Sequence, residues 1–160
     1  MENNLMHLLS NGDILRSLHV LNTIDVGKLK ELDMIRPLHV CALQGNIPDI
    51  ANVLVNKGAD INGKSTIGFA MAHYIAQDGK SELFKLLHTL GADLNVQNRV
   101  GGTPLHVAAF FGHTDCVSVL LELGANQDIK NKYGETALVV AQQEEHSDCA
   151  TLLQHITKRT

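Results

Sequence analysis

The sequence has little of what marks secreted, extended or membrane proteins. Its 160 residues include no tryptophan, three prolines and three cysteines. The cysteines form no Cys-x-x-Cys pair and leave one over, which argues against a disulfide framework. The longest apolar runs, such as residues 137–141, fall far below the roughly 18 residues that a membrane span needs. A membrane protein and a disulfide-rich secreted domain are therefore not expected.

The start of the chain and its charge narrow the class further. Glu2, Asn3 and Asn4 stand where a secretory signal would begin with cations, so an intracellular protein of the cytoplasm or nucleus is expected. The 13 Lys and Arg against 17 Asp and Glu give a net charge of −4, with the two signs interspersed. Without a basic stripe, neither nucleic acid nor anionic lipid is an expected partner. Protein partners are favoured, with the chain itself a monomer.

What the sequence does contain is a regular period. A Gly-Ala-Asp/Asn motif recurs at one constant interval, at Gly58, Gly91 and Gly124. A second motif recurs at nearly the same interval, starting at Arg36, Ala70, Thr103 and Thr136. A period of this length is typical of a solenoid, in which each repeat buries its apolar face against its neighbours.

The third unit, residues 98–130, resembles the ankyrin repeat, because it carries Thr-Pro-Leu-His-Val-Ala, then Gly-His, then Leu-Leu-x-x-Gly-Ala-Asn. The resemblance covers about residues 31–156 and implies an all-α solenoid of helix-turn-helix repeats joined by β-turn or hairpin fingers. Repeats are placed at residues 31–64, 65–97 and 98–130. A degenerate N-terminal cap is placed at 1–30 and a C-terminal capping repeat at 131–160.

The landmarks of the third unit also have physical reasons of their own. Thr103 offers an N-cap hydroxyl, and Pro104 suits the first helical position because its missing N–H costs nothing there. His106 is placed to hydrogen-bond back to the cap. Gly112 ends the first helix, and Gly124 is the left-handed stop of the second.

Two other units depart from this pattern. The second has Ala70 and Met71 in place of Thr and Pro, so its first helix is expected to lack the cap and to fray first. The fourth has Val139 in place of the motif histidine and Glu145 in place of the helix-ending glycine. These changes suit a repeat that closes the array.

The segment from Gly58 to Ser65 matches the phosphate-loop pattern Gly-x-x-x-x-Gly-Lys-Ser. It supports an alternative function, a nucleotide-binding protein or enzyme, only if a strand precedes the loop and a helix follows it. The period instead assigns residues 48–57 to a helix that Gly58 ends, and Asp60 would repel a phosphate inside the loop.

No other motif predicts catalysis, a metal or a cofactor. The nine histidines show no His-x-x-x-His or His-Glu-x-x-His spacing. No Gly-x-Ser-x-Gly elbow occurs. Cys116 and Cys149 fall on the inward apolar faces of their helices. A non-catalytic protein is expected.

The resemblance further implies that a partner binds the finger tips and the exposed sides of the first helices, which line the concave face. Beside polar positions such as Gln77, Glu135, Gln143 and Glu144, the strongest candidates are Ile67, Phe69, Arg99, Val100, Phe110, Phe111, Lys132 and Tyr133. Four of only six aromatic residues lie among them, which is typical of a binding hot spot. The alternative is that Phe110 and Phe111 close the apolar layer beneath the fingers and contact only neighbouring repeats. The expected function is a scaffold, adaptor or inhibitor that binds one protein partner.

Two asparagines suggest a modification. Asn62 and Asn95 each follow a leucine by eight residues, Leu54 and Leu87. In ankyrin proteins that this chain resembles, such an asparagine can be hydroxylated by an oxygenase that recognises the leucine. The alternative role is to hydrogen-bond the turn backbone.

Overall fold

The computed structural model describes residues 19, 23 and 47–157. Its successive helices are α5 (Ile47–Asn56), α6 (Met71–Asp78), α7 (Leu83–Thr89), α8 (Pro104–Phe111), α9 (Thr114–Glu122), α10 (Ala137–Gln143) and α11 (Ser147–Thr157). The described ranges contain helices and turns but no strand, which confirms the all-α prediction. The predicted N-terminal cap lies almost wholly outside these ranges, as do the Arg36 motif and Cys41.

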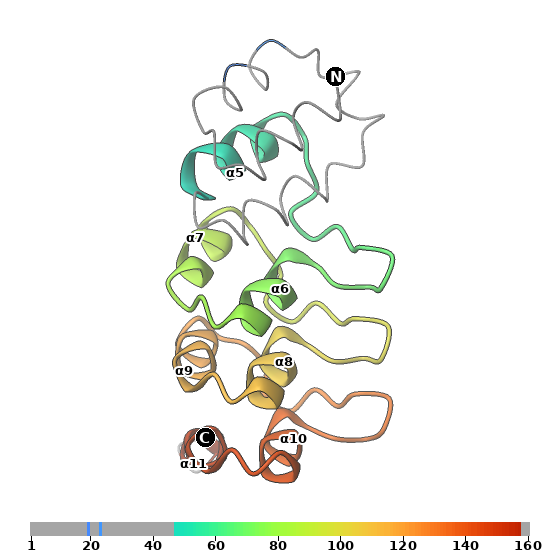
Figure 1. The fold of residues 1–160 in the computed structure, drawn as a ribbon, viewed down its shortest axis with the longest axis vertical. Coiled ribbons are helices and arrows are strands. Elements are labelled where there is room, and N and C mark those ends of the chain that lie inside the picture. Colours follow the sequence, from blue (N-terminus) through green and yellow to red (C-terminus); the bar gives the residue numbers. More distant parts are fainter. Residues whose placement is uncertain (1–18, 20–22, 24–46, 158–160) are drawn as a thin grey trace.

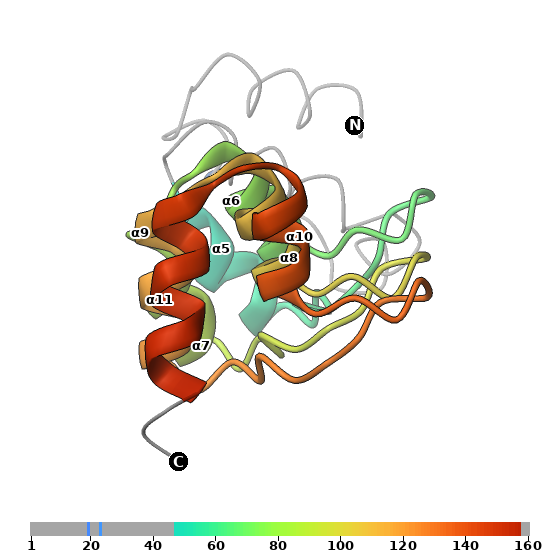
Figure 2. The ribbon, with the colours of Figure 1, turned by 90° about the horizontal axis from the view of Figure 1, so that it is seen from below.

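The helices stack as antiparallel pairs in two layers. Figure 1 shows the pairs α6/α7, α8/α9 and α10/α11 following one another along the long axis, with a loop projecting to the same side before each pair. Figure 2 looks along the stack and shows α6, α8 and α10 forming the layer next to these loops. Within each layer, every helix from α6 onward contacts the next. The loops are the predicted fingers, and the repeat boundaries stay a prediction.

The core lies between the two helix layers. Phe84 and Leu87 of α7 and Leu120 of α9 are fully buried and face Leu105 and its neighbours from the inner layer. One continuous cluster of buried side chains runs through all the described pairs. Burying a side chain of this size contributes about 1.5–3 kcal/mol, so the stacking of neighbours holds these short helices in place.

Helix α8 begins as its sequence predicts. Pro104 is its first residue, and the Nδ1 atom of His106 accepts a hydrogen bond from the Thr103 N–H at 3.2 Å. Because that nitrogen is an acceptor, the Thr103 hydroxyl, 2.9 Å away, donates to it as well. The histidine therefore satisfies the free N–H at the helix start.

Helix α6 keeps more of its cap than its sequence suggests. Ala70 has φ −86° and ψ 170°, close to the −89° and 169° of Thr103. His73 Nδ1 accepts the Ala70 N–H at 3.1 Å. The loss expected from Ala70 is that of the cap hydroxyl, and the histidine contact is kept. That this helix frays first stays a prediction.

Helices of both layers end in left-handed turns. After α9, Gly124 has φ +87°, its N–H donates to Leu121 O, and the Ala125 N–H donates to Leu120 O. These are the two bonds of a Schellman motif, and glycine is favoured there because it has no Cβ. At the end of α10, Glu145 takes the same conformation with φ +60°, in the place where the sequence lacks a glycine.

Candidate protein-binding groove

Each finger tip is closed by its first residue, at a position that recurs once in each repeat. Asn98 N–H donates to Gly102 O at 2.9 Å, and the Asn98 side-chain oxygen accepts the Gly102 N–H at 2.9 Å. Asn131 makes the same pair of bonds with Glu135. The tips at residues 98–102 and 131–135 are also joined, because the Lys132 N–H donates to Val100 O at 2.9 Å. The tips thus form a fixed row along the stack.

Buried histidines fix this row to the inner helices. His73 Nε2 lies 3.0 Å from Gly102 O, and His106 Nε2 lies 3.0 Å from Glu135 O. Since Nδ1 of each ring is an acceptor at its own helix start, Nε2 carries the proton and donates. Each first helix is therefore bonded to the base of the next finger.

Both imidazoles are neutral at neutral pH. Burial lowers the pKa of His73 from its ordinary 6.5 to about 4, although the Gly102 carbonyl acts in the opposite direction. Burial also lowers the pKa of His106, against the opposing influence of the Glu135 carbonyl and carboxylate. The fingers are thus held by neutral hydrogen bonds rather than by ion pairs.

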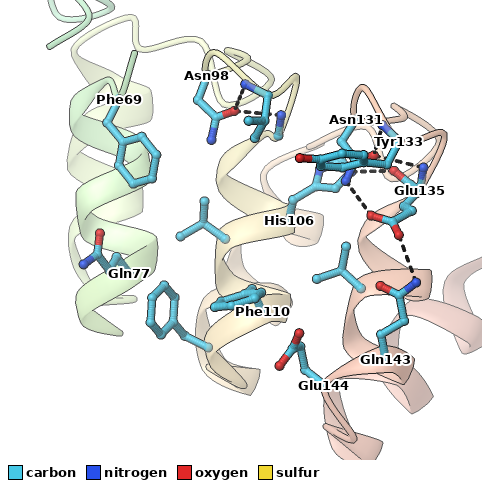
Figure 3. A pocket seen from close by; sticks show the side chains of 15 residues that line it. Phe69, Gln77, Asn98, His106, Phe110, Asn131, Tyr133, Glu135, Gln143 and Glu144 are labelled. Carbon is cyan, nitrogen blue, oxygen red and sulfur yellow. Dashed lines mark hydrogen bonds between the residues drawn. The ribbon is translucent and has the colours of Figure 1, made fainter. Parts of the chain in front are cut away.

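An open groove of about 410 Å³ lies between the fingers and the inner helices. Val107, Phe110 and Val140 supply apolar surface from α8 and α10, while Val100 and Tyr133 enter from the finger tips. Figure 3 shows the Phe110 ring in this space, with Tyr133 and Glu135 on the finger side and Gln143 and Glu144 on the side of α10. This volume falls within the range of about 300–1,000 Å³ that is usual for ligand pockets.

Several large apolar side chains around the groove are exposed. The exposed fraction is 48% for Phe110 and 44% for Phe111, whose rings meet edge to face with centroids 5.1 Å apart. Val100 is 37% exposed and Tyr133 is 67% exposed. Because nearly half of each phenylalanine faces solvent, neither ring closes a buried layer.

Phe69 differs from its expected outward position. The side chain is half-buried, packs against the core, and stacks on His73 at a centroid distance of 5.1 Å. Ser65 closes this finger as Asn98 and Asn131 close the others, because its N–H donates to Phe69 O and its Oγ accepts the Phe69 N–H. The ring also meets Tyr74 edge to face, with centroids 5.4 Å apart. Only the edge of the groove is left to this ring.

Three predicted residues lie at the tips and do not line the groove. Ile67 is 57% exposed. Arg99 packs against Gly68, where an added Cβ would lie 2.6 Å from its Cγ. Lys132 places Nζ 4.9 Å from the centroid of the Tyr133 ring, in a cation–π contact. The groove itself brings together Phe69, Val100, Phe110, Phe111 and Tyr133.

Some lining residues escaped prediction. Asn98 and Asn131 shape the finger tips, and Val107 and Val140 form part of the apolar surface. The signal for the asparagines was present, because they stand one period apart. The two valines are separated by the same interval, but an apolar residue on a short helix resembles any core position.

The two predicted asparagine sites join one finger base to the next. Asn62 Oδ1 accepts the Asp93 N–H at 2.7 Å, and Asn95 Oδ1 accepts the Asn126 N–H at 2.7 Å. These bonds confirm that both side chains bind turn backbone, here that of the following repeat. Hydroxylation stays a prediction.

The segment from Gly58 to Ser65 lacks the setting of a phosphate loop. Helix α5 precedes it, where a strand would be required, and Gly58 ends that helix with φ +92°. The Ser65 N–H is used by Phe69 O, and the Asp60 carboxylate accepts the Asn62 N–H at 2.9 Å. The arrangement is that of a helix stop followed by a finger.

The described part of the chain was also expected to hold no metal site and no reactive cysteine. No group of three or more His, Cys, Asp and Glu side chains there is placed to hold a metal ion. Cys116 and Cys149 are buried, as predicted, and burial raises the pKa of the Cys116 thiol to about 12. Of the helices in these ranges, none has the length and apolar character to cross a bilayer.

Paired helices stacked in register, with a finger before each pair, define the class of helical solenoid repeat proteins. Within that class, a model of ankyrin repeats in three copies matches residues 72–159, and a model of the single ankyrin repeat matches residues 36–66. The chain belongs to the ankyrin repeat family. Repeats of this family generally mediate interactions between proteins and are typically non-catalytic. Among curated proteins, none matches this sequence.

Proposed function

We propose that this chain is a non-catalytic scaffold, adaptor or inhibitor that binds one protein partner in the groove between its fingers and inner helices. The observation that carries the proposal is the exposed apolar surface of Val100, Phe110, Phe111 and Tyr133, which comes from successive fingers and α8. Aromatic side chains are enriched among the residues that dominate binding energy. Exposing several of them on one face favours a partner that covers them.

The rigidity of the surface supports the same proposal. The His73 and His106 bonds, the Asn98 and Asn131 loops, and the bond between Lys132 and Val100 hold the fingers before any partner arrives. A preformed surface loses little conformational entropy on binding, so more of the contact energy appears as affinity. No reaction is required of these residues.

The test is quantitative affinity capture from native cells with the whole chain and a double variant, Phe110→Ala with Tyr133→Ala. Loss of two anchors worth about 2 kcal/mol each should weaken binding by about 30-fold per anchor. Gln154→Ala is the control, because this exposed side chain lies on α11, outside the groove and outside the predicted binding positions. If the double variant keeps the wild-type melting temperature and the wild-type affinity for the captured protein, the proposal is wrong.

A further inference from the structure

The apolar groove has one acidic side. Glu135 shortly precedes α10 and Glu144 immediately follows it, and both line the groove. Figure 3 shows the Glu144 carboxylate beside the Phe110 ring, while Glu135 lies between Tyr133 and Gln143. A partner side chain that covers Phe110 must therefore approach two negative charges.

Glu135 is held in its ionised form. Asn131 Nδ2 donates to one carboxylate oxygen at 2.9 Å, and Gln143 Nε2 donates to the other at 2.9 Å. These bonds hold the pKa of Glu135 below its usual value, since they favour the charged form. Both donors are neutral amides, so they fix the carboxylate in place without cancelling its charge.

Neither Lys132 nor His106 compensates the negative charge of Glu135. The Nζ atom of Lys132 lies over the Tyr133 ring, 4.9 Å from its centroid. The ring of His106 donates to the Glu135 carbonyl, and burial lowers its pKa, so it is neutral at neutral pH. Among the described residues, the Glu144 side chain makes no ion pair or hydrogen bond, and no residue lining the groove carries a positive charge.

We infer that the groove selects a partner segment that sets a bulky apolar side chain on Phe110 and, close beside it, a lysine or arginine between Glu135 and Glu144. This inference rests on the proposed function. A segment without a cation would remove water from the two carboxylates without replacing the lost hydration by an ion pair. An acidic segment would be repelled. Charge complementarity with a fixed carboxylate therefore sets the chemistry of the partner.

The test is selection of a random displayed peptide library on the full chain, followed by titration of a synthesised winning peptide. Winning peptides should combine a bulky apolar residue with Lys or Arg a few positions away. Glu144→Gln and Glu135→Gln should each weaken binding roughly five-fold, in line with a single rim ion pair. Raising the salt from about 50 mM to about 500 mM should weaken wild-type binding more than binding to either variant.

The matched control is Glu122→Gln on α9, which removes an exposed carboxylate outside the groove and should leave the titration unchanged. If Glu135→Gln fails to fold, Glu144→Gln alone decides, because the Glu144 side chain is bonded to nothing among the described residues.

The outcomes of the peptide selection distinguish a wrong inference about the cation from a wrong proposed function. Peptides that require Phe110 but lack a cation overturn the inference, as do peptides that bind both glutamine variants like the wild type. The proposed function then still stands. If no peptide is enriched, or if the enriched ones bind Phe110→Ala unchanged, both are contradicted.

Discussion

Acid should destabilise the fold through His73. The folded pKa is about 4 and the ordinary value is 6.5. Between these values the unfolded chain binds a proton that the folded chain excludes, so the contribution of this group to stability is complete above pH 6.5 and falls as the pH drops toward 4. A proton added to Nδ1 would also meet the Ala70 N–H and break that bond. Protonation therefore acts on the start of α6, whereas the Nε2 bond to Gly102 O is kept.

The magnitude follows from the two pKa values. Each unit of pKa difference corresponds to about 1.4 kcal/mol. On lowering the pH from about 7 to about 5, the unfolded imidazole becomes charged while the folded one stays neutral, which removes about 2 kcal/mol from the free energy of unfolding. His106 shifts in the same direction, so the wild-type loss should exceed this amount. This is a large fraction of the about 5–15 kcal/mol by which most domains are stable.

The assay is denaturant unfolding of the wild type and of His73→Gln across this pH range. The variant should be less stable at neutral pH, because the bond to Gly102 is weakened, but its stability should fall less steeply with acid, by about 2 kcal/mol over the range. His88→Gln, which removes an exposed histidine from α7, is the reference for losing any histidine. Equal slopes for the two variants, or an NMR titration of the His73 ring with a midpoint near 6.5, would refute the reasoning.

Helix ends offer three more predictions, each measured as a change in the free energy of unfolding. Ala70→Thr should stabilise by about 1 kcal/mol by adding the missing cap hydroxyl, whereas Ala70→Val should not. Glu145→Gly should stabilise by about 1 kcal/mol, since it relieves a left-handed residue. Gly112→Ala should cost about 2 kcal/mol or more, because φ is +72° and the new Cβ would meet His146 Nδ1 at 2.6 Å. Gly124→Ala, also left-handed but with open space around it, should cost only about 1 kcal/mol.

Features set by local chemistry were predictable from the sequence. The Thr103 cap, the proline that follows it and the glycine stop at Gly124 each act within a few residues, so a motif is enough to place them. The period then supplies the stacking. The fold of the described repeats follows from these rules without any knowledge of long-range contacts.

Features that depend on contacts between side chains were not predictable. Phe69 has an outward position in the repeat, yet its ring packs on His73 and Tyr74 and is half-buried. Glu135 looks like one more exposed carboxylate until Asn131 and Gln143 are seen to donate to both of its oxygens. In both cases contacts between side chains decide, and one position of the repeat carries Phe69, Gly102 and Glu135 in turn.

The period itself explains why the scaffold is easier to predict than the binding chemistry. Gln77, Phe110 and Gln143 occupy the same position in successive repeats, and all three line the groove. One geometric position is thus occupied by an amide, an aromatic ring and a second amide. The fold needs no particular side chain there, because the buried core between the helix layers, together with the helix caps and left-handed stops, holds the repeats in place. Phe110, at the apolar centre of the groove, therefore lies one predicted repeat before Glu135, and a partner bound in the proposed way would have to match that order of side chains along the stack.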